Sequence, residues 1–579
     1  DKAGCSSSVF TSLAERGIIT TYLNKVSRLD DETTEIRLNT LNPHQQLAFE
    51  QINTVFDSKD VCLLNGVTSS GKTEIYIHLI NKALSEGRQV LYLLPEIALT
   101  TQITHRLKRV FGNRLGVYHS KFPDAERIEV WKKQLSDAPY DVVLGVRSSV
   151  FLPFSKLGLV IVDEEHEATY KQQEPAPRYN ARNTAIVLAQ KYAHAKVLLG
   201  SATPSVESFY NAKQGKYGLV SLSVRHEGVE LPHINPIDIK ELYRKKRMRG
   251  MFSPELVEGM RSAIESGEQV ILFQNRRGFA PMLECKTCGW NPRCSHCDVT
   301  LTYHKKINKL TCHYCGEVYN VPTSCPACQS TEIIDLGAGT EKIEEEVAHM
   351  FPTARVLRMD MDTAKTKNSY ERIISDFADR KADVLIGTQM VSKGLDFDNV
   401  SLVGIVYADG MLNFPDFRAH ERAFQLMSQV AGRAGRRQKR GRVLLQTKKV
   451  ENSIISQIVG NDYIGMLEKE LSDRKLLSYP PFSRLIYVYI KHRDEAVADD
   501  FAKQMSAALR QNLGSCVLGA SKPMVSRVQS LFIRTIMIKA PVTGSLHQLK
   551  DYLHQVEQFY AESNPKFKSV KVYYDVDPM

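Results

Sequence analysis

Eight of the eleven cysteines in this 579-residue sequence form four C-x-x-C units within one short segment. Each unit lets two thiolates converge on one metal ion, and two units complete a tetrahedral Cys₄ zinc site. The sequence therefore predicts two structural Zn²⁺ ions, although spacing alone does not decide which units share an ion. Iron–sulfur ligation is the alternative that cysteines by themselves leave open. The predicted zinc ligands are Cys285, Cys288, Cys294, Cys297, Cys312, Cys315, Cys325 and Cys328.

A phosphate-binding loop of the form G-x-x-x-x-G-K-[ST] occupies residues 66–73. It follows an apolar run and precedes a helical stretch, which is the order that this motif requires. The glycines let backbone N–H groups turn toward phosphates, Lys72 would reach the β- and γ-phosphates, and Thr73 would ligate Mg²⁺. The predicted ATP and Mg²⁺ ligands are Gly66, Val67, Thr68, Ser69, Ser70, Gly71, Lys72 and Thr73, together with Gln45, Asp163, Gly394 and Asp396.

Acidic residues and arginines complete the predicted hydrolysis site. Asp163 and Glu164 end an apolar run, at the position where α/β sheets present chemistry. Asp163 would hold Mg²⁺, and Glu164 would orient the attacking water. Arg433 and Arg436 lie on a glycine-bounded turn in the second half and could act as arginine fingers that stabilise charge in the transition state. The predicted catalytic residues are Lys72, Asp163, Glu164, Arg433 and Arg436.

A loop directly after the acidic pair alternates aromatic and basic residues. This pattern suits base stacking combined with phosphate neutralisation, and an ordinary polar loop is the alternative. Thr203 follows another buried strand, where its hydroxyl could bridge the hydrolysis site to a neighbouring surface. The candidate DNA contacts or coupling residues are Arg147, Tyr170, Lys171, Tyr179, Arg182, Thr203, Arg276 and Arg277.

The elements that must position these residues alternate between apolar β-type runs and helical stretches. Such alternation implies a parallel sheet that is covered on both faces. One series runs from about residue 45 to about residue 222. A second begins at 270–273, after a basic connector at 240–249, and the cysteine segment interrupts it. The tail after residue 451 has the strand and helix order of a split βαβ domain.

We therefore predict an α/β fold. It consists of two RecA-like parallel-sheet lobes with a double zinc-ribbon insertion in lobe 2, a winged-helix remnant at the N-terminus and a C-terminal α+β split-βαβ domain. The N-terminal assignment depends on an expected helix at 7–15, and an unstructured leader is the alternative. The predicted domains are residues 1–38 (winged-helix remnant), 39–222 (lobe 1), 223–283 (connector and start of lobe 2), 284–330 (two-zinc ribbon), 331–450 (lobe 2) and 451–579 (C-terminal domain).

Composition and charge restrict the environment of the chain. The net charge of +11 is compatible with a polyanionic partner without requiring one. No apolar run approaches the ~18 residues that a membrane helix needs, and no signal peptide opens the chain. The clustered C-x-x-C spacing favours metal over disulfides, so we expect a reducing cytoplasm. Because the first residue is Asp1 rather than Met, we expect that an upstream domain is missing.

The motifs together resemble superfamily 2 helicases, with DEEH in the place of DEAH. More narrowly, the chain resembles the family of bacterial primosomal helicases (PriA, primosomal protein N′). The matching segments are GVTSSGKTEIY, LLPEIALT, DEEHEATYKQQE, GSATPSVE, NRRGFAP, GTQMVSKGLDF, QVAGRAGR and the terminal YYDVDP. The resemblance covers residues 41–579, and the N-terminal domain with which that family grips a nascent 3′ end has no counterpart in it.

This resemblance implies a DNA-dependent ATPase that translocates 3′ to 5′, remodels stalled or abandoned replication forks and initiates primosome assembly. It implies a nested zinc arrangement, with Cys285, Cys288, Cys325 and Cys328 on one ion and Cys294, Cys297, Cys312 and Cys315 on the other; a sequential arrangement is the rival. The post-DEEH loop would report bound single-stranded DNA to the ATPase site. The implied partners are forked and single-stranded DNA, single-stranded-DNA-binding protein, primosome proteins and helicase loaders, for a monomer associated with the nucleoid.

Two other functions remain compatible with the motifs. One is an RNA helicase or general remodelling motor of the same superfamily, which comparing ATPase stimulation by single-stranded DNA and RNA would identify. The other is a non-enzymatic zinc-ribbon scaffold with a decayed motor. The intact Lys72, Glu164 and Arg436 argue against decay.

Overall fold

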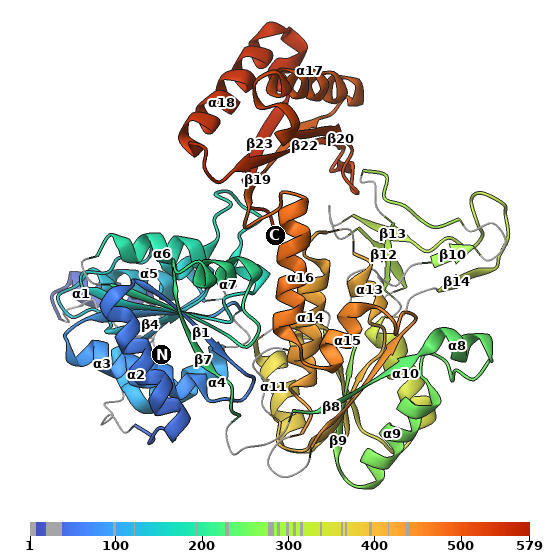
Figure 1. The fold of residues 1–579 in the computed structure, drawn as a ribbon, viewed down its shortest axis with the longest axis horizontal. Coiled ribbons are helices and arrows are strands. Elements are labelled where there is room, and N and C mark those ends of the chain that lie inside the picture. Colours follow the sequence, from blue (N-terminus) through green and yellow to red (C-terminus); the bar gives the residue numbers. More distant parts are fainter. Residues whose placement is uncertain are drawn as a thin grey trace.

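In the computed structural model, two parallel-sheet lobes lie side by side, with a small cysteine-rich domain beside the second lobe and a C-terminal domain above both (Figure 1). This arrangement confirms the predicted fold class. The structure describes residues 7–18, 38–96, 100–120, 122–192, 195–225, 231–275, 283–285, 290–296, 300–304, 308–312, 317–335, 339–360, 363–364, 367–392, 397–414, 416–435 and 440–579.

Lobe 1 contains a seven-stranded parallel sheet in the order β3-β4-β2-β5-β6-β1-β7. The strands are β1 (Val61–Gly66), β2 (Gln89–Leu93), β3 (Leu115–Tyr118), β4 (Val142–Gly145), β5 (Leu157–Asp163), β6 (Lys196–Ser201) and β7 (Gly218–Leu222). The helices are α2 (Pro43–Ser58), α3 (Lys72–Ser85), α4 (Thr100–Phe111), α5 (Asp124–Gln134), α6 (Ala181–Gln190) and α7 (Val206–Lys213). Every residue of β2 and β4 is buried, because separate apolar cores form on the two faces of this sheet.

Lobe 2 contains a six-stranded parallel sheet in the order β15-β16-β9-β17-β18-β8. The strands are β8 (His233–Asp238), β9 (Gln269–Phe273), β15 (Val356–Met359), β16 (Val384–Gly387), β17 (Val400–Ile405) and β18 (Arg442–Thr447). The prediction that this sheet starts at 270–273 was wrong, because β8 already pairs in parallel with β18. The helices are α8 (Ile239–Arg244), α9 (Pro254–Glu265), α10 (Thr340–Met350), α11 (Lys367–Ala378), α12 (Gln389–Ser392), α13 (Asp409–Leu412) and α14 (Ala419–Ala431).

Two further helices, α15 (Ser453–Val459) and α16 (Tyr463–Leu476), belong to lobe 2 rather than to the C-terminal domain. Their apolar residues Ile454, Ile458 and Leu467 are buried in the same core as the strands of lobe 2. The predicted boundary at residue 451 was therefore too early. These helices carry no motif, so only packing reveals that they extend the lobe.

The C-terminal domain has the predicted split βαβ order. Its antiparallel sheet runs β20-β22-β19-β23, with β21 paired to β22. The elements are β19 (Ser483–His492), α17 (Glu495–Leu513), β20 (Val517–Ser521), β21 (Arg527–Val528), β22 (Leu531–Pro541), α18 (Leu546–Ser563) and β23 (Lys571–Val576). Alternate residues of β19, such as Val488 and Ile490, face a core shared with both helices.

The remaining described segments are short. Strands β10 (Leu283–Cys285) and β14 (Ile333–Asp335) pair antiparallel, as do β11 (Thr302–His304), β12 (Lys309–Thr311) and β13 (Val318–Asn320). Near the N-terminus, α1 (Ser7–Glu15) confirms the expected helix. Residues 19–37 of the predicted winged-helix remnant lie outside the described residues.

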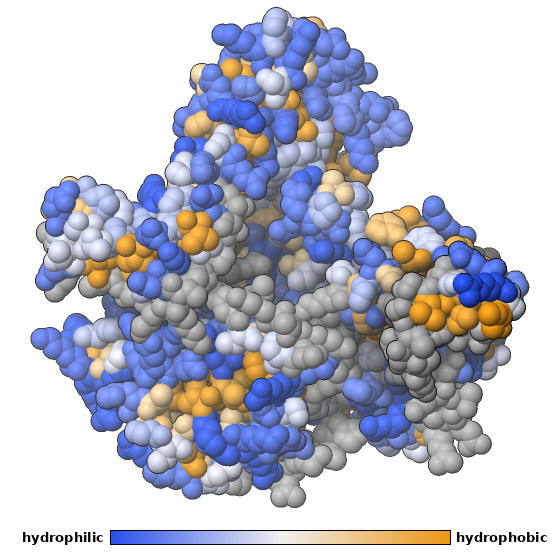
Figure 2. Space-filling model, turned by 180° about the vertical axis from the view of Figure 1, so that it is seen from behind, coloured by the Kyte–Doolittle hydropathy of each residue, from blue (hydrophilic) through white to orange (hydrophobic). Residues whose placement is uncertain are grey.

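Seen from behind, the C-terminal domain and the two lobes form separate bulges around a central hollow (Figure 2). Hydrophobic side chains on this face gather in small separate patches. Within the described ranges, none of the helices has the length and apolar character that crossing a membrane requires.

Candidate ATP site and its contacts

The phosphate-binding loop connects β1 to α3, as the sequence predicted. Gly71 precedes the helix with φ +83°, a left-handed conformation that favours glycine. At the other end of the loop, Lys72 donates from Nζ to the carbonyl of Gly66 at 2.7 Å. A Cβ on Gly66 would lie 3.0 Å from carbons of the Lys72 side chain, so this glycine leaves room for the folded-back lysine. The loop therefore holds Lys72 at the end of β1, ready to turn toward a phosphate.

The loop also contains buried polar atoms that are available to bind a ligand. The hydroxyls of Ser69 and Ser70 are buried and have no hydrogen-bond partner among the described residues. Gln45 is fixed by a capping box with Asn42 and donates to the carbonyl of Ser70 at 3.2 Å. Unsatisfied buried donors cost free energy unless a ligand accepts from them, so this loop fits a bound phosphate chain. Gln45 lies beside the loop, while its predicted contact with ATP stays a prediction.

Asp163 ends β5 in a pocket of tyrosines. Its carboxylate accepts hydrogen bonds from Tyr76 at 3.1 Å and from Tyr92 at 3.2 Å. Gly200 on the neighbouring β6 makes this possible, because a Cβ there would lie 1.8 Å from the Tyr76 hydroxyl. These two phenols fix the carboxylate at the sheet edge, next to the phosphate-binding loop. Nothing in the sequence distinguishes these two tyrosines from ordinary core residues.

The charges of Asp163 and Glu164 suit the binding of a divalent cation. Burial and the neighbouring Glu164 raise the pKa of Asp163 to about 6, against the opposing effect of Lys72. Glu164 has a positive φ of 47°, and its Oε2 is buried without a hydrogen bond in the described part of the chain. The His166 ring lies 3.6 Å from that oxygen. A bound Mg²⁺ would neutralise the buried Asp163 carboxylate, with Glu164 beside it, so this position fits the predicted Mg²⁺ ligand.

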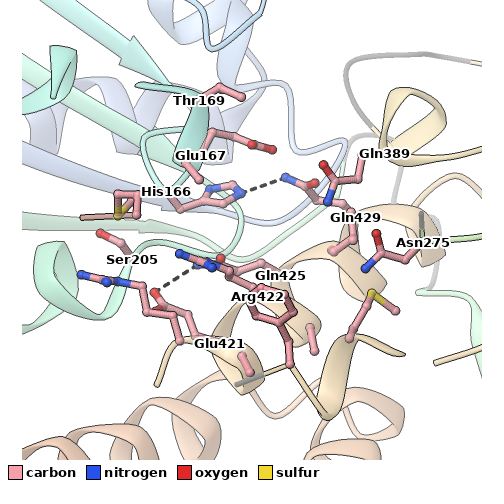
Figure 3. Close-up of a pocket in the computed structure, with 18 of the residues that line it drawn as sticks. His166, Glu167, Thr169, Ser205, Asn275, Gln389, Glu421, Arg422, Gln425 and Gln429 are labelled. Atoms are coloured by element: carbon pink, nitrogen blue, oxygen red, sulfur yellow. Dashed lines mark hydrogen bonds between the residues drawn. The ribbon is translucent and has the colours of Figure 1, made fainter. Parts of the chain in front are cut away.

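Residues of lobe 2 reach the acidic motif from the other side of a crevice (Figure 3). His166 Nδ1 lies 2.7 Å from Ser201 Oγ, and its Nε2 lies 2.9 Å from Nε2 of Gln429 on α14. One turn earlier, Gln425 donates to the carbonyl of Thr203 at 3.3 Å. The GSAT and QVAGRAGR segments, which are far apart in sequence, therefore meet at the DEEH motif.

Arg433 lies beside this meeting point. Its partly buried position lowers its pKa to about 10, and the charge of Glu164 opposes that shift. The preceding Gly432 sits against the phosphate-binding loop, since a Cβ there would lie 2.9 Å from a Thr68 methyl carbon. The structure thus brings Arg433 into the site where a finger would act. The predicted residues Arg436, Gly394 and Asp396 lie outside the described residues.

Two of the candidate DNA contacts in the loop after DEEH, Tyr170 and Lys171, are packed inside the protein. The Tyr170 ring is fully buried, and its hydroxyl donates to the carbonyls of Leu93 (3.0 Å) and Asp163 (2.6 Å). Lys171 is also buried and forms a 2.7 Å ion pair with Asp575 of the C-terminal domain. Direct contact of these two side chains with DNA is contradicted in this conformation, because neither is accessible.

Other candidate DNA contacts also have internal partners. Arg147 donates to the carbonyls of Thr169 and Lys171, both at 3.1 Å, and so shapes the same loop. Tyr179 is half-buried against Phe151, with ring centroids 4.7 Å apart. Neither position excludes a DNA contact at its exposed edge, so both stay predictions.

Arg182 and Thr203 are both buried, so neither side chain presents an exposed surface to DNA. Arg182 is buried and donates to Glu165 at 2.7 Å and to Ser205 at 2.8 Å, which joins DEEH to the start of α7. Thr203 is buried between the lobes and its hydroxyl has no described partner, which fits a bridging role but not an exposed DNA contact. Arg276 and Arg277 lie outside the described residues.

A buried charge network that the sequence did not reveal joins the lobes. Glu207 at the start of α7 pairs with Arg418 at 3.1 Å and with Arg474 at 3.6 Å. Arg474 also pairs with Glu421 at 2.6 Å and with Glu470 at 3.2 Å. In the sequence these residues look like solvated helix positions, and only the lobe contact buries them.

The cysteine segment brings thiols together as a metal site requires. The Sγ atoms of Cys285, Cys325 and Cys328 all lie within 4.8 Å of one another. This convergence fits the nested arrangement and contradicts the sequential one, in which Cys285 would share its ion with Cys294. Cys294 and Cys312 are buried in one apolar cluster with Leu301 and Leu310. The thiols therefore fit Zn²⁺. The ligands outside the described residues are Cys288, Cys297 and Cys315.

Four protein-family models match parts of this chain. The sequence matches the DEAD/DEAH box helicase family over residues 42–211 and the helicase conserved C-terminal domain over 327–438. It matches the PriA DNA helicase Cys-rich region domain over 294–318 and the primosomal protein N C-terminal domain over 475–579. Among solved structures, RecG bound to a three-way DNA junction has a TM-score of 0.44 at 16% identity, over 75% of this chain and 47% of that chain.

Curated relatives extend the match to nearly the whole chain. Replication restart protein PriA of Bacillus subtilis (strain 168) is 40% identical over 569 residues, which cover 96% of this chain and 70% of that protein. The protein of the same name from Haemophilus influenzae is 39% identical over 586 residues, covering 99% of this chain and 78% of that protein. The predicted resemblance is thereby confirmed, and this chain belongs to the family of replication restart proteins PriA.

Proposed function

We propose that this chain is an ATP-dependent DNA helicase that moves 3′ to 5′, remodels stalled or abandoned replication forks and initiates primosome assembly. One observation supports the motor activity above all others. Lys72, Asp163 and Glu164 of lobe 1 lie together, and Arg433 reaches them from lobe 2. A hydrolysis site that needs both lobes can convert nucleotide turnover into lobe movement.

Each residue has a role in this proposal. The loop amides and Lys72 would bind the phosphates of ATP, and Asp163 would hold Mg²⁺, which neutralises charge on those phosphates. Glu164 would orient and polarise the attacking water. Arg433 is permanently charged and would stabilise the charge that develops as the terminal phosphoryl group leaves. Because Arg433 sits on lobe 2, this stabilisation would depend on lobe closure.

The cysteine-rich domain would contribute to partner loading rather than to hydrolysis. Its thiols would hold two structural Zn²⁺ ions, and it lies beside lobe 2 on the side away from lobe 1 (Figure 1). Single-stranded-DNA-binding protein, primosome proteins and helicase loaders are the partners that we propose for the whole molecule, acting as a monomer on nucleoid DNA.

Two measurements test the proposal. ATP hydrolysis is measured with single-stranded DNA, with single-stranded RNA and without nucleic acid, and we expect strong stimulation by DNA only. Unwinding is then measured on partial duplexes with either a 3′ or a 5′ tail, and on forks with and without a nascent leading strand. Equal stimulation by RNA would indicate a general motor, and unwinding that requires a 5′ tail would contradict the proposed polarity.

A further inference from the structure

Lys171 joins the C-terminal domain to the loop that follows the DEEH motif. Its side chain is 2% exposed, and that of its partner Asp575 is 11% exposed, with the Nζ and Oδ1 atoms 2.7 Å apart. The same ammonium donates to the carbonyl of Val576 at 2.6 Å and to that of Arg178 at 2.8 Å. Three oxygens from two domains thus converge on one buried cation.

The preceding residue, Tyr170, connects this joint to the hydrolysis site. Its hydroxyl donates at 2.6 Å to the backbone carbonyl of Asp163, the residue whose carboxylate lies in the ATP site. It also donates to Leu93, at the end of the adjacent strand. Tyr170 therefore contacts the strand that ends in Asp163, and the next residue, Lys171, contacts the C-terminal domain.

Further contacts hold the same loop on the last strand of the chain. The Arg178 guanidinium lies 4.2 Å from the ring centroid of Tyr573 on β23. Gln173 donates to the carbonyl of Met579 at 3.3 Å. The loop is therefore docked along residues 573–579, and Asp575 supplies the buried carboxylate of that docking surface.

We infer that Asp575 is a positioning residue for ATP hydrolysis and acts on Asp163 through Lys171 and Tyr170. Removing the carboxylate would leave the Lys171 cation buried without its counter-charge, which is strongly unfavourable. The loop would then leave the C-terminal domain or admit water, and the Tyr170 contact with the catalytic strand would loosen. This inference rests on the proposed ATPase function, which it extends to a second domain.

The experiment measures steady-state ATP hydrolysis at saturating single-stranded DNA for the full chain and four variants. They are Asp575→Asn, Asp575→Glu, Lys171→Met and the double variant Lys171→Met with Asp575→Asn. We expect Asp575→Asn to lower kcat about 5-fold, with KM for ATP and Kd for DNA changed less than about 2-fold. We expect Asp575→Glu to keep more than about half of the kcat, because it retains the charge.

The kcat of the double variant tests most directly whether Lys171 and Asp575 act through one contact. If both residues act through one contact, the double variant loses no more kcat than the worse single variant. The matched control is Asp551→Asn on α18, which removes an exposed carboxylate of the same domain, paired only with His547 among the contacts of the described residues. This control should leave kcat unchanged. Thermal unfolding of each variant shows whether the C-terminal domain remains folded.

Three results would overturn the inference: an unchanged kcat in Asp575→Asn, losses that add in the double variant, or a loss in Asp575→Glu as large as in Asp575→Asn. A variant that unfolds the C-terminal domain and loses kcat only to the same extent as that domain unfolds would also count against it. If the unaltered chain is not stimulated by DNA, the proposed function itself fails, which is a different outcome from stimulated hydrolysis that Asp575→Asn leaves intact.

Discussion

Nε2 of Gln429 in lobe 2 lies 2.9 Å from Nε2 of His166 in lobe 1. A glutamine amide nitrogen only donates, so this ring nitrogen of His166 accepts and its Nδ1 carries the proton. Nδ1 then donates to Ser201 Oγ at 2.7 Å. Residues of both lobes thus set the orientation of His166, and its contact with Gln429 determines which ring nitrogen carries the proton.

Replacing Gln429 with alanine should remove its contact with His166 between the two lobes. We expect the kcat of DNA-stimulated hydrolysis to fall about 10-fold, because closure no longer aligns the histidine beside Glu164. The affinity for single-stranded DNA, measured by fluorescence anisotropy, should stay within about 2-fold. Gln558→Ala on the exposed face of α18 is the matched control. Unchanged turnover in Gln429→Ala would show that the contact is only structural.

Lys72→Ala and Glu164→Gln should each lower ATP turnover by orders of magnitude, because catalysis of phosphoryl transfer is almost entirely positioning and electrostatics. Binding of single-stranded DNA should largely persist in both variants. Hydrolysis is measured by phosphate release in parallel with DNA binding. Near-normal turnover in either variant would overturn the site assignment.

Loss of the metal should impair the functions of the cysteine-rich domain more than ATP hydrolysis by the two lobes. Elemental analysis should find two zinc ions per chain, and one zinc or iron would contradict this. Replacing Cys294 and Cys297 with serine should unfold the domain locally, since metal binding supplies much of its folding free energy. We expect ATP hydrolysis to survive better than unwinding or partner loading. Equal loss of all three activities would make this domain part of the motor core.

Glu470 should make stability depend on pH. Burial raises its pKa from 4.5 to about 7, with Glu421 adding to the shift and Arg474 opposing it. The folded state therefore binds the proton more tightly than the unfolded state, and stability falls as pH rises from about 4.5 to about 7. The full shift corresponds to roughly 3 kcal/mol. Asp163 contributes with the same sign, and His420, whose pKa burial lowers, contributes with the opposite sign.

The Glu470→Gln variant isolates the contribution of this carboxyl to the pH dependence of stability. The apparent unfolding midpoint of the chain and of Glu470→Gln is measured at about pH 5.5 and about pH 8, at one scan rate. We expect a smaller decrease between the two pH values in the variant. An identical pH dependence would show that the Glu470 carboxyl does not titrate in this window.

Tyr170→Ala should act as a core mutation. Loss of its buried ring leaves a cavity, and such changes cost about 3–5 kcal/mol of unfolding free energy. Tyr170→Phe keeps the ring but removes the one O–H donor that the carbonyls of Leu93 and Asp163 share, at a cost of about 1–3 kcal/mol. Chemical denaturation measures both. A Tyr170→Ala variant as stable as the unaltered chain would instead indicate an accessible ring.

Local sequence patterns encode the phosphate-binding loop, the strand that ends in Asp163 and helix α14 before Arg433. The C-x-x-C spacing predicted thiol ligands, while the grouping of Cys285 with Cys325 and Cys328 came from the family resemblance. Local patterns do not reveal burial that depends on a distant element. Tyr170 and Lys171 look like an exposed aromatic and basic loop, and nothing local announces that the C-terminal domain covers them.

The edge strand of lobe 2 has a consequence for how the chain is synthesised. β8 pairs with β18, which leaves the ribosome about 200 residues later, after the whole cysteine-rich domain. The nascent chain therefore carries an unpaired strand for most of lobe 2 synthesis, a state that is prone to wrong pairing. Pro236 in the middle of β8 lacks an N–H donor and limits such pairing on one side. Lobe 2 thus becomes a complete sheet only after its last strand has been synthesised, whereas every strand of lobe 1 is available before β8 is synthesised.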